Sequence, residues 1–229
     1  QKCWASLYGA RAIYYRSKQG FDDRSVNIAV VVQQLVNSEK AGVMFTSHPV
    51  TGEPLVIIEG AWGLGEAVVS GSVSPDKYIF DQRTGKVIDR LIVKKKTAIV
   101  SDGDHGTRTL DLPPDRQDTP VLTDDEVAQL AKFGMIAETH YGVPQDVEWG
   151  IVGDEIYILQ SRPITTIRQT APASYVAAAT ETILVRGQGA SPGIATGRVV
   201  IVKDIKDTGK IQKGDILVTP MTNPDMVPA

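Results

Sequence analysis

The sequence predicts an α+β fold, in which helices flank an antiparallel-rich sheet. Short apolar runs such as 41–48 and 54–60 are separated by turns that contain Gly and Pro, which is typical of strands joined by tight connections. A capped helical pattern over 123–142 stands between such strands, and a hairpin pattern over 145–163 follows it. Together these patterns favour an antiparallel-rich sheet with helices packed against it.

The composition indicates an ordinary soluble globular chain. Of its 229 residues, 42% are hydrophobic and 22% are charged. The net charge of −3 gives no general reason to expect nucleic acid or an anionic membrane as a partner. Cys3 is the only cysteine, which excludes an intrachain disulfide and fits a reducing, cytoplasmic location. No apolar run approaches the roughly 20 residues of a membrane span.

The first part of the chain predicts one helix and several strands. Residues 4–17 have a helical pattern that ends at Gly20 after a polar stretch. The near-continuous apolar run over 26–36 predicts a buried strand. Two short strands follow at 41–48 and 54–60, with "PVTGEP" as the turn between them.

The middle of the chain continues this pattern. The stretch "GAWGLG" (60–65) predicts a glycine loop that opens a short helix, and 77–95 predicts two strands around an Arg-Thr-Gly turn. Residues 101–120 are polar and carry Gly and Pro, which predicts a loop. The helix over 123–142 has capping-box spacing at its start, acids in its first turn and a glycine at its end.

The stretch "QDVEWGIVGDEIYILQSRP" (145–163) carries four polar side chains at regular intervals on two otherwise apolar strands. Side chains alternate between the two faces of a strand. Asp146 and Glu148 therefore share one face of the first strand, and Gln160 and Arg162 share one face of the second.

The turn decides whether the two polar pairs meet, because directly opposed residues lie on the same side of an antiparallel pair. A two-residue turn at 153–154 would place Gln160 opposite Val147 and send the acids to the other side. A three-residue loop at 153–155 places it opposite Glu148, and the other acid opposite the arginine. We predict the second register.

This register gathers two carboxylates, a carboxamide and a guanidinium on one patch. Carboxylate and amide oxygens suit Mg²⁺, which prefers a few such ligands together with phosphate oxygens. A neighbouring guanidinium suits phosphate through a bidentate fork. The combination predicts phosphoryl-transfer chemistry. On spacing alone, a solvated hairpin face held by salt bridges is an open alternative.

The chain predicts two domains. Residues 1–166 hold the α+β pattern, and 167–182 turn to Ala, Thr and Ser with little apolar periodicity, which is typical of a linker. Apolar order returns over 183–229, as expected for the start of a second, β-rich domain. The chain begins without methionine inside a helical pattern and stops without a closing element, so we interpret it as a piece of a larger protein.

Several motifs, in this order, resemble the phosphoenolpyruvate synthase and pyruvate phosphate dikinase family: "ARAIYYR", "VVVQQLV", "AGVMFTSHPVTG", "EGAWGLGE" and "PQDVEWGI…IYILQSRPI". Further on, "GQGASPGIATGRV" and "GDILVTPMTNPDMVP" are similar to the opening of the family's phosphohistidine domain. The resemblance covers nearly the whole chain. It implies that 1–166 is the C-terminal part of an ATP-grasp nucleotide-binding domain and that 183–229 begins a truncated, swivelling phosphohistidine domain.

The resemblance also implies roles for single residues. Glu148 and Gln160 match metal ligands, Asp146 matches a nearby metal or phosphate carboxylate, and Arg162 matches a catalytic phosphate contact. Glu66, after the glycine loop, is expected to face the metals. Without the resemblance, the glycine loop is best interpreted as a tight turn. The apolar segment that ends at residue 36 is best interpreted as a core strand. In the family, this strand end borders the adenine; it consists here of Gln33, Gln34, Leu35 and Val36.

By this resemblance, the parent enzyme uses ATP and Mg²⁺ to phosphorylate a histidine on the swivelling domain, which carries the group to pyruvate in a separate barrel. The products are phosphoenolpyruvate, AMP and phosphate. The family's other nucleotide lobe should precede Gln1, and the acceptor histidine and the barrel should follow Ala229. We therefore expect the chain alone to be inactive and to bind ATP weakly. The resemblance leaves a homodimer of the full-length enzyme open.

Three alternatives stay open. Rifampicin phosphotransferase shares this architecture but phosphorylates an antibiotic, and "NPDMVPA" favours the synthase. The dikinase uses phosphate in place of water, and its nucleotide domain carries insertions that are not seen here. The third is a non-catalytic nucleotide-binding module, against which the acid and Gln/Arg pairs argue. None of His48, His105 and His140 follows the family's Gly-Gly-x-Thr-x-His acceptor pattern.

Overall fold

The structure is a computed structural model, which describes residues 1–21, 26–49, 51–165, 167, 195–203, 205–219 and 226. The chain divides into two units, which are described separately. The larger unit spans Val36–Ile194, and the smaller one combines Gln1–Leu35 with Ala195–Ala229. The predicted linker over 167–182 lies outside the described residues, apart from Ile167.

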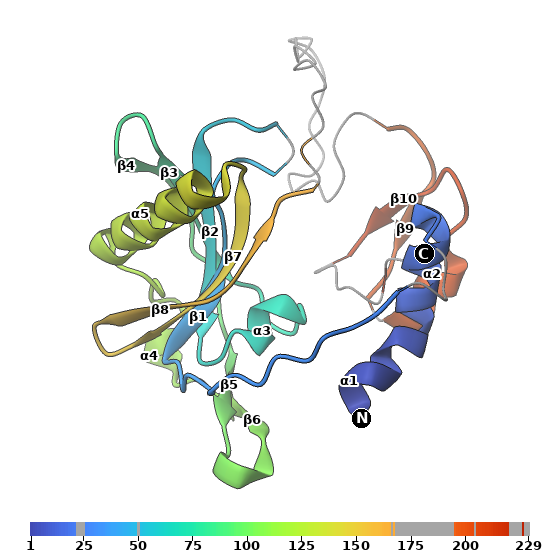
Figure 1. The fold of residues 1–229 in the computed structure, drawn as a ribbon, viewed down its shortest axis with the longest axis horizontal. Helices are drawn as coiled ribbons and strands as arrows, with labels where there is room; N and C mark the ends of the chain where they lie inside the picture. Colours follow the sequence, from blue (N-terminus) through green and yellow to red (C-terminus); the bar gives the residue numbers. More distant parts are fainter. Residues whose placement is uncertain are drawn as a thin grey trace. The chain divides into compact units, whose positions relative to one another are not determined.

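An antiparallel sheet of six strands forms the centre of the larger unit (Figure 1). The strand order is β4-β3-β2-β1-β7-β8, and each neighbouring pair is antiparallel. The α+β prediction, with an antiparallel-rich sheet and flanking helices, is confirmed at this level. The strands are β1 (Lys40–Phe45), β2 (Leu55–Trp62), β3 (Asp76–Asp81), β4 (Lys86–Leu91), β7 (Gln145–Val152) and β8 (Glu155–Pro163).

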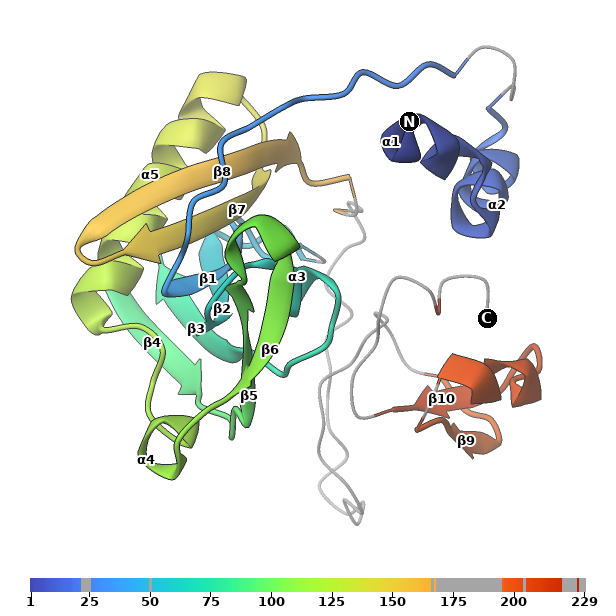
Figure 2. The same ribbon diagram turned by 90° about the horizontal axis from the view of Figure 1, so that it is seen from below.

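Helix α5 (Asp124–Tyr141) covers one face of this sheet (Figures 1 and 2). The predicted capping box is confirmed, because Thr123 and Glu126 bond to each other's backbone amides. The helix ends at Gly142, which has the left-handed φ of 71°. Buried α5 side chains pack in one core with side chains of β1, β2, β3 and β7, including Trp149. This core fixes which side chains of each strand point away from α5.

The other face of the sheet carries the short helix α3 (Glu66–Val69), whose Ala67 packs against Ala61 of β2. A separate hairpin, β5 (Thr97–Ser101) and β6 (Thr107–Asp111), closes through the 3₁₀ turn η2 (Gly103–His105) and leads to helix α4 (Pro114–Gln117). The expectation of a loop over 101–120 is therefore wrong in part. Backbone hydrogen bonds to β5 hold the polar strand β6, which needs no apolar face of its own.

The smaller unit contains helices and a two-stranded parallel sheet. The helical pattern predicted for 4–17 is present, but Gly9, with an extended backbone, interrupts it. The predicted stop at Gly20 is confirmed by its left-handed φ of 70°. No helix in the described parts of either unit is long and apolar enough to cross a membrane. The elements of this unit are α1 (Lys2–Ala5), η1 (Ser6–Tyr8), α2 (Ala10–Gln19), β9 (Val199–Ile201), η3 (Ile205–Lys210) and β10 (Ile216–Val218).

The buried strand predicted over 26–36 is wrong. Residues 26–36 form neither helix nor strand, and the side chains of Val31 and Val32 are 82% and 95% exposed. An apolar run becomes a buried strand only where neighbouring strands satisfy its backbone groups. Among the described strands, none pairs with this segment.

Candidate functional site

The sheet face opposite α5, here called the polar face, carries the four polar side chains of the β7–β8 hairpin. Val147 and Trp149 belong to the core under α5, so Asp146 and Glu148 point to the other side. Strand pairing continues this face across the sheet. One row runs through Lys77, Glu59, Val43, Glu148 and Gln160, and the next runs through Ile79, Ile57, Phe45, Asp146 and Arg162.

The pairing predicted for the hairpin is confirmed, but the predicted turn is wrong. A two-residue turn at 153–154 joins the strands in place of the expected three-residue loop. The register then shifts by one between Glu148 and Trp149, where Leu159 is an extra residue in β8. This β-bulge places Gln160 opposite Glu148, which a two-residue turn alone would not do.

Both predicted pairs are in contact. Gln160 Nε2 donates to Glu148 Oε1 over 3.3 Å. Arg162 places Nε at 2.9 Å and Nη2 at 2.8 Å from the same oxygen of Asp146, Oδ2. The Arg162 side chain is 65% exposed whereas that of Asp146 is only 15% exposed, so the carboxylate anchors one edge of the guanidinium and the rest faces solvent. An anion has access to that open edge.

These donors fit a magnesium ion after one side-chain rotation. Gln160 presents its amide nitrogen to Glu148, and this nitrogen is a donor that does not bind a cation. A half-turn about the broad terminal torsion of the amide places Oε1 there, beside the Glu148 oxygen. Two such oxygens suit Mg²⁺, which fills its other positions with water or phosphate oxygens. In the described parts of the chain, no three His, Cys, Asp or Glu side chains converge on one metal position.

The segment expected to border the adenine meets the polar face at its end. Residues 33–35 are exposed and belong to the smaller unit, whereas Val36 begins the larger one. The Val36 carbonyl accepts a hydrogen bond from the Ser38 amide over 2.8 Å. Ser38 lies over Gly150 of β7, where an added Cβ would be 2.2 Å from the serine Oγ. Gly150 is on the same face of β7 as Glu148, so the chain after Val36 borders the polar face.

The glycine-rich stretch 60–65 is a structural junction between β2 and α3. The amides of Gly63 and Leu64 donate to backbone carbonyls over 2.8 and 2.7 Å. Two amides that a phosphate cradle would use are therefore already bonded, which favours the tight-turn interpretation. Glu66 accepts a hydrogen bond from Thr107 of β6 over 3.2 Å. Its role toward metals stays a prediction.

The pairing brings two further charged residues to the polar face, Glu59 of β2 and Lys77 of β3, which are directly opposed. Glu59 is half-buried; burial raises its pKa and the charge of Lys77 partly offsets this. Glu59 is the only charged residue in the apolar run 55–62, which is a signal visible in the sequence. Its row depends on the register of β1, which the sequence does not reveal.

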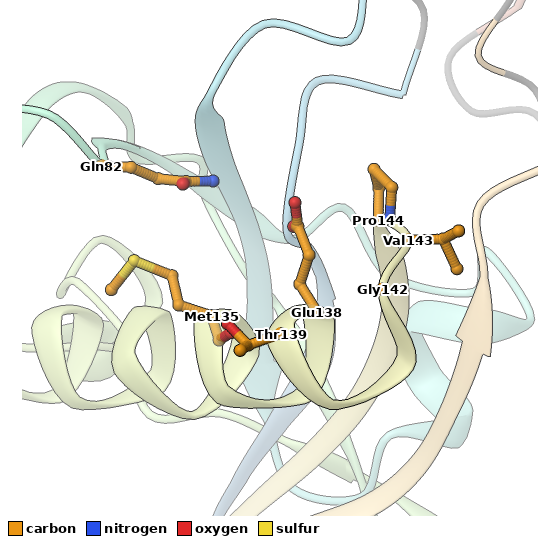
Figure 3. A pocket seen from close by; sticks show the side chains of 7 residues that line it. All are labelled: Gln82, Met135, Glu138, Thr139, Gly142, Val143 and Pro144. Carbon is orange, nitrogen blue, oxygen red and sulfur yellow. The ribbon is translucent and has the colours of Figure 1, made fainter.

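A pocket of 410 Å³ lies at the C-terminal end of α5 (Figure 3). Its lining includes Gln82, Met135, Glu138 and Pro144. Gln82 donates to the Thr46 carbonyl over 2.6 Å, and one buried oxygen of Glu138 has no hydrogen-bond partner within the described residues. The pocket is on the α5 side of the sheet, away from the polar face, so it is a separate feature from the candidate site.

Comparison with protein families matches residues 1–182 to the family described as pyruvate phosphate dikinase, AMP/ATP-binding domain. The whole chain is 53% identical to a probable phosphoenolpyruvate synthase of Methanothermobacter thermautotrophicus, of which it covers 33%. It is 48% identical to the phosphoenolpyruvate synthase of Pyrococcus furiosus and covers 29% of that protein. The chain spans a third or less of the length of the curated relatives that it matches, from 33% down to 20%.

Proposed function

Because the chain belongs to the pyruvate phosphate dikinase AMP/ATP-binding domain family, we propose that its polar face is one wall of a Mg²⁺–ATP site in a longer phosphotransferase. The names of the relatives support phosphoenolpyruvate synthase, also called pyruvate, water dikinase, as the activity. That enzyme passes a phosphoryl group from ATP through a phosphohistidine to pyruvate. Water accepts the other phosphoryl group, so the products are phosphoenolpyruvate, AMP and phosphate.

One observation supports this proposal above the others: the pairing of β7 with β8 places Glu148 opposite Gln160 and Asp146 opposite Arg162. A purely structural hairpin with this two-residue turn has no need of a bulge at Leu159, since a regular ladder bonds its backbone at least as well. The effect of the bulge is therefore on where the side chains lie, and not on the backbone hydrogen bonding. It puts a metal-binding oxygen pair beside an anion-binding guanidinium on one half-open surface.

Each of these side chains has a distinct task in the proposed site. Glu148 and Gln160 would hold Mg²⁺, which would offset the charge of the bound phosphates. Arg162 contacts the phosphates through its exposed edge, while Asp146 fixes the plane of the guanidinium. Glu66 acts from the start of α3 toward the metals. The base is bordered by Gln33, Gln34, Leu35 and Val36.

The chain alone is proposed to be inactive and to bind ATP weakly. It corresponds to a third or less of each relative, so groups that hold the triphosphate and accept the phosphoryl group are proposed to belong to the remaining length. A cytoplasmic location goes with this proposal. Titration calorimetry of the isolated chain with Mg-ATP tests it, and tight binding would contradict it.

The activity is tested in the full-length protein by AMP formation with pyruvate or with rifampicin as acceptor. We expect AMP with pyruvate only, and loss of that signal in Glu148→Gln. Glu155→Gln is the matched control, because Glu155 is an exposed glutamate of the same hairpin whose carboxylate, among the described residues, accepts a hydrogen bond from Tyr157. Full activity of Glu148→Gln would exclude the proposed metal ligand and favour a non-catalytic module, and AMP with rifampicin alone would identify an antibiotic kinase.

A further inference from the structure

We infer that Glu59 is a positioning residue of the cation site. Its carboxylate would accept a hydrogen bond from a water of the bound ion, on the side of Glu148 opposite Gln160. The inference rests on the proposed function, since it needs a divalent cation at Glu148. Its basis is the row in which β2, β1 and β7 place Glu59, Val43 and Glu148 side by side. Only the aliphatic side chain of Val43 separates the two carboxylates along this row.

The spacing between strands determines how far apart Glu59 and Glu148 lie. Neighbouring strands lie about 4.8 Å apart, so the Cα atoms of Glu59 and Glu148 are separated by about 10 Å. Two glutamate side chains that lean toward each other across a valine leave room for a hydrated ion between them. Contact through a water is favoured over direct ligation by both, because a Cα separation of about 10 Å with a valine between them leaves room for a hydrated ion. Mg²⁺ keeps several of its waters in proteins, and Glu59 is placed to accept a hydrogen bond from one of them when the ion is bound at Glu148.

Among the described contacts of Glu59, the charge of Lys77 on β3 only partly offsets the cost of its burial. Its neighbours along the face are Val43, Ile57 and Ala61, and Lys77 opposes it on β3 without an ion pair among the described contacts. A half-buried carboxylate with neither a hydrogen bond nor an ion pair among the described contacts is costly for the folded state. Burial accordingly raises the pKa of Glu59, so a nearby cation would stabilise the ionised form. A residue kept at such a cost is typical of a binding site.

The test is Mn²⁺ binding to the full-length protein, followed by electron paramagnetic resonance of the free ion, in the presence of a non-hydrolysable ATP analogue. We expect Glu59→Gln to weaken Mn²⁺ binding about tenfold, as loss of an outer-sphere partner does. Lys77→Met should instead strengthen Mn²⁺ binding, because it removes a competing positive charge from the row. Glu155→Gln is the control that should leave binding unchanged.

A second readout separates this role from a structural one. Without metal, Glu59→Gln should unfold at the same temperature as the parent protein or at a higher one, since it removes a half-buried charge that Lys77 only partly compensates. A lower unfolding temperature would show that Glu59 stabilises the fold, and would overturn the inference. Parent-like Mn²⁺ binding in Glu59→Gln, with binding lost in Glu148→Gln, would overturn it as well and leave the proposed function intact. Parent-like binding in both variants would overturn the inference and the proposed metal site together.

Discussion

Arg162 contacts Asp146 through two nitrogens and a single oxygen: Nε and Nη2 lie 2.9 and 2.8 Å from Oδ2. A planar guanidinium held along one edge has a fixed plane, so its opposite edge meets a phosphate in a defined geometry. A lysine carries the same charge but has no such plane. The carboxylate therefore matters for the orientation of the arginine as well as for its charge.

Replacing Arg162 by lysine should lower kcat for AMP formation about 100-fold in the full-length protein, which is the size of effect seen when one oriented donor to developing charge is lost. Steady-state kinetics with pyruvate measures this. The matched control is Arg90→Lys, since Arg90 of β4 forms a surface pair with Asp124 at 3.2 Å. Equal rates for the two variants would show that Arg162 does not contact the reacting phosphates.

Deletion of Leu159 should keep the cation site, because it removes only the extra residue of the bulge. The two-residue turn would then continue into a regular register in which Gln160 still lies opposite Glu148 and Arg162 opposite Asp146. We expect Mn²⁺ binding to be retained in the full-length protein, with the sheet signal of far-ultraviolet circular dichroism unchanged. Leu159→Ala, which keeps the bulge, is the matched control and should bind Mn²⁺ equally well; a deletion variant that keeps its sheet signal but no longer binds the ion would show that the facing of the two pairs is not sufficient for the site.

The hairpin shows how far the sequence could predict the site. Alternation of side chains established that Asp146 shares a face with Glu148, and Gln160 with Arg162. The facing of the two pairs was predicted correctly but for the wrong reason, because a loop length was invoked where a bulge provides the shift. A bulge leaves no residue signature as clear as a turn does, so only the partner strand reveals it.

The predictions that failed have a common physical cause: which strands pair depends on the tertiary fold and not on the local sequence. The apolar run 26–36 has the composition of a strand, yet no described strand pairs with it. The polar residues 107–111 form β6 because β5 offers them backbone partners. Glu59 belongs to the row of Glu148 only because β1 lies between β2 and β7. By contrast, the caps of α5 are local, and they were predicted correctly.

An interior ion pair anchors the connections around β3. Lys95 Nζ lies 2.5 Å from Asp76 Oδ1, and both side chains are almost fully buried. Asp76 also accepts hydrogen bonds from the amides of Val93 and Val121 and from the Tyr78 hydroxyl, which ties two loops to the strand. Replacing Lys95 by methionine leaves this carboxylate buried without its cation, and should cost about 3–5 kcal/mol of unfolding free energy.

Equilibrium urea unfolding measures this cost, and Lys94→Met is the control. Lys94 is the neighbouring residue, but it is exposed and lies 3.7 Å from Asp118 in a surface pair. The control should change stability by less than about 0.5 kcal/mol. If both variants lose the same stability, the Asp76–Lys95 pair has no special role in holding the loops.

Glu126 should make the stability of the larger unit depend on pH. Burial raises the pKa of Glu126, but hydrogen bonds from Lys40, at 2.6 Å, and from Thr123 outweigh this, so the pKa lies below its ordinary value of 4.5. The carboxylate is thus favoured in the folded state, and its contribution is complete above about pH 4.5 and is lost as pH falls through the lower, folded pKa. The free-energy gap between the parent chain and Glu126→Gln in urea unfolding should therefore be largest near neutral pH and shrink toward about pH 3.

Glu155→Gln, which changes an exposed carboxylate, should show a small gap at every pH. A gap for Glu126→Gln that stays constant over this range would mean that Lys40 and Thr123 do not favour its ionised form.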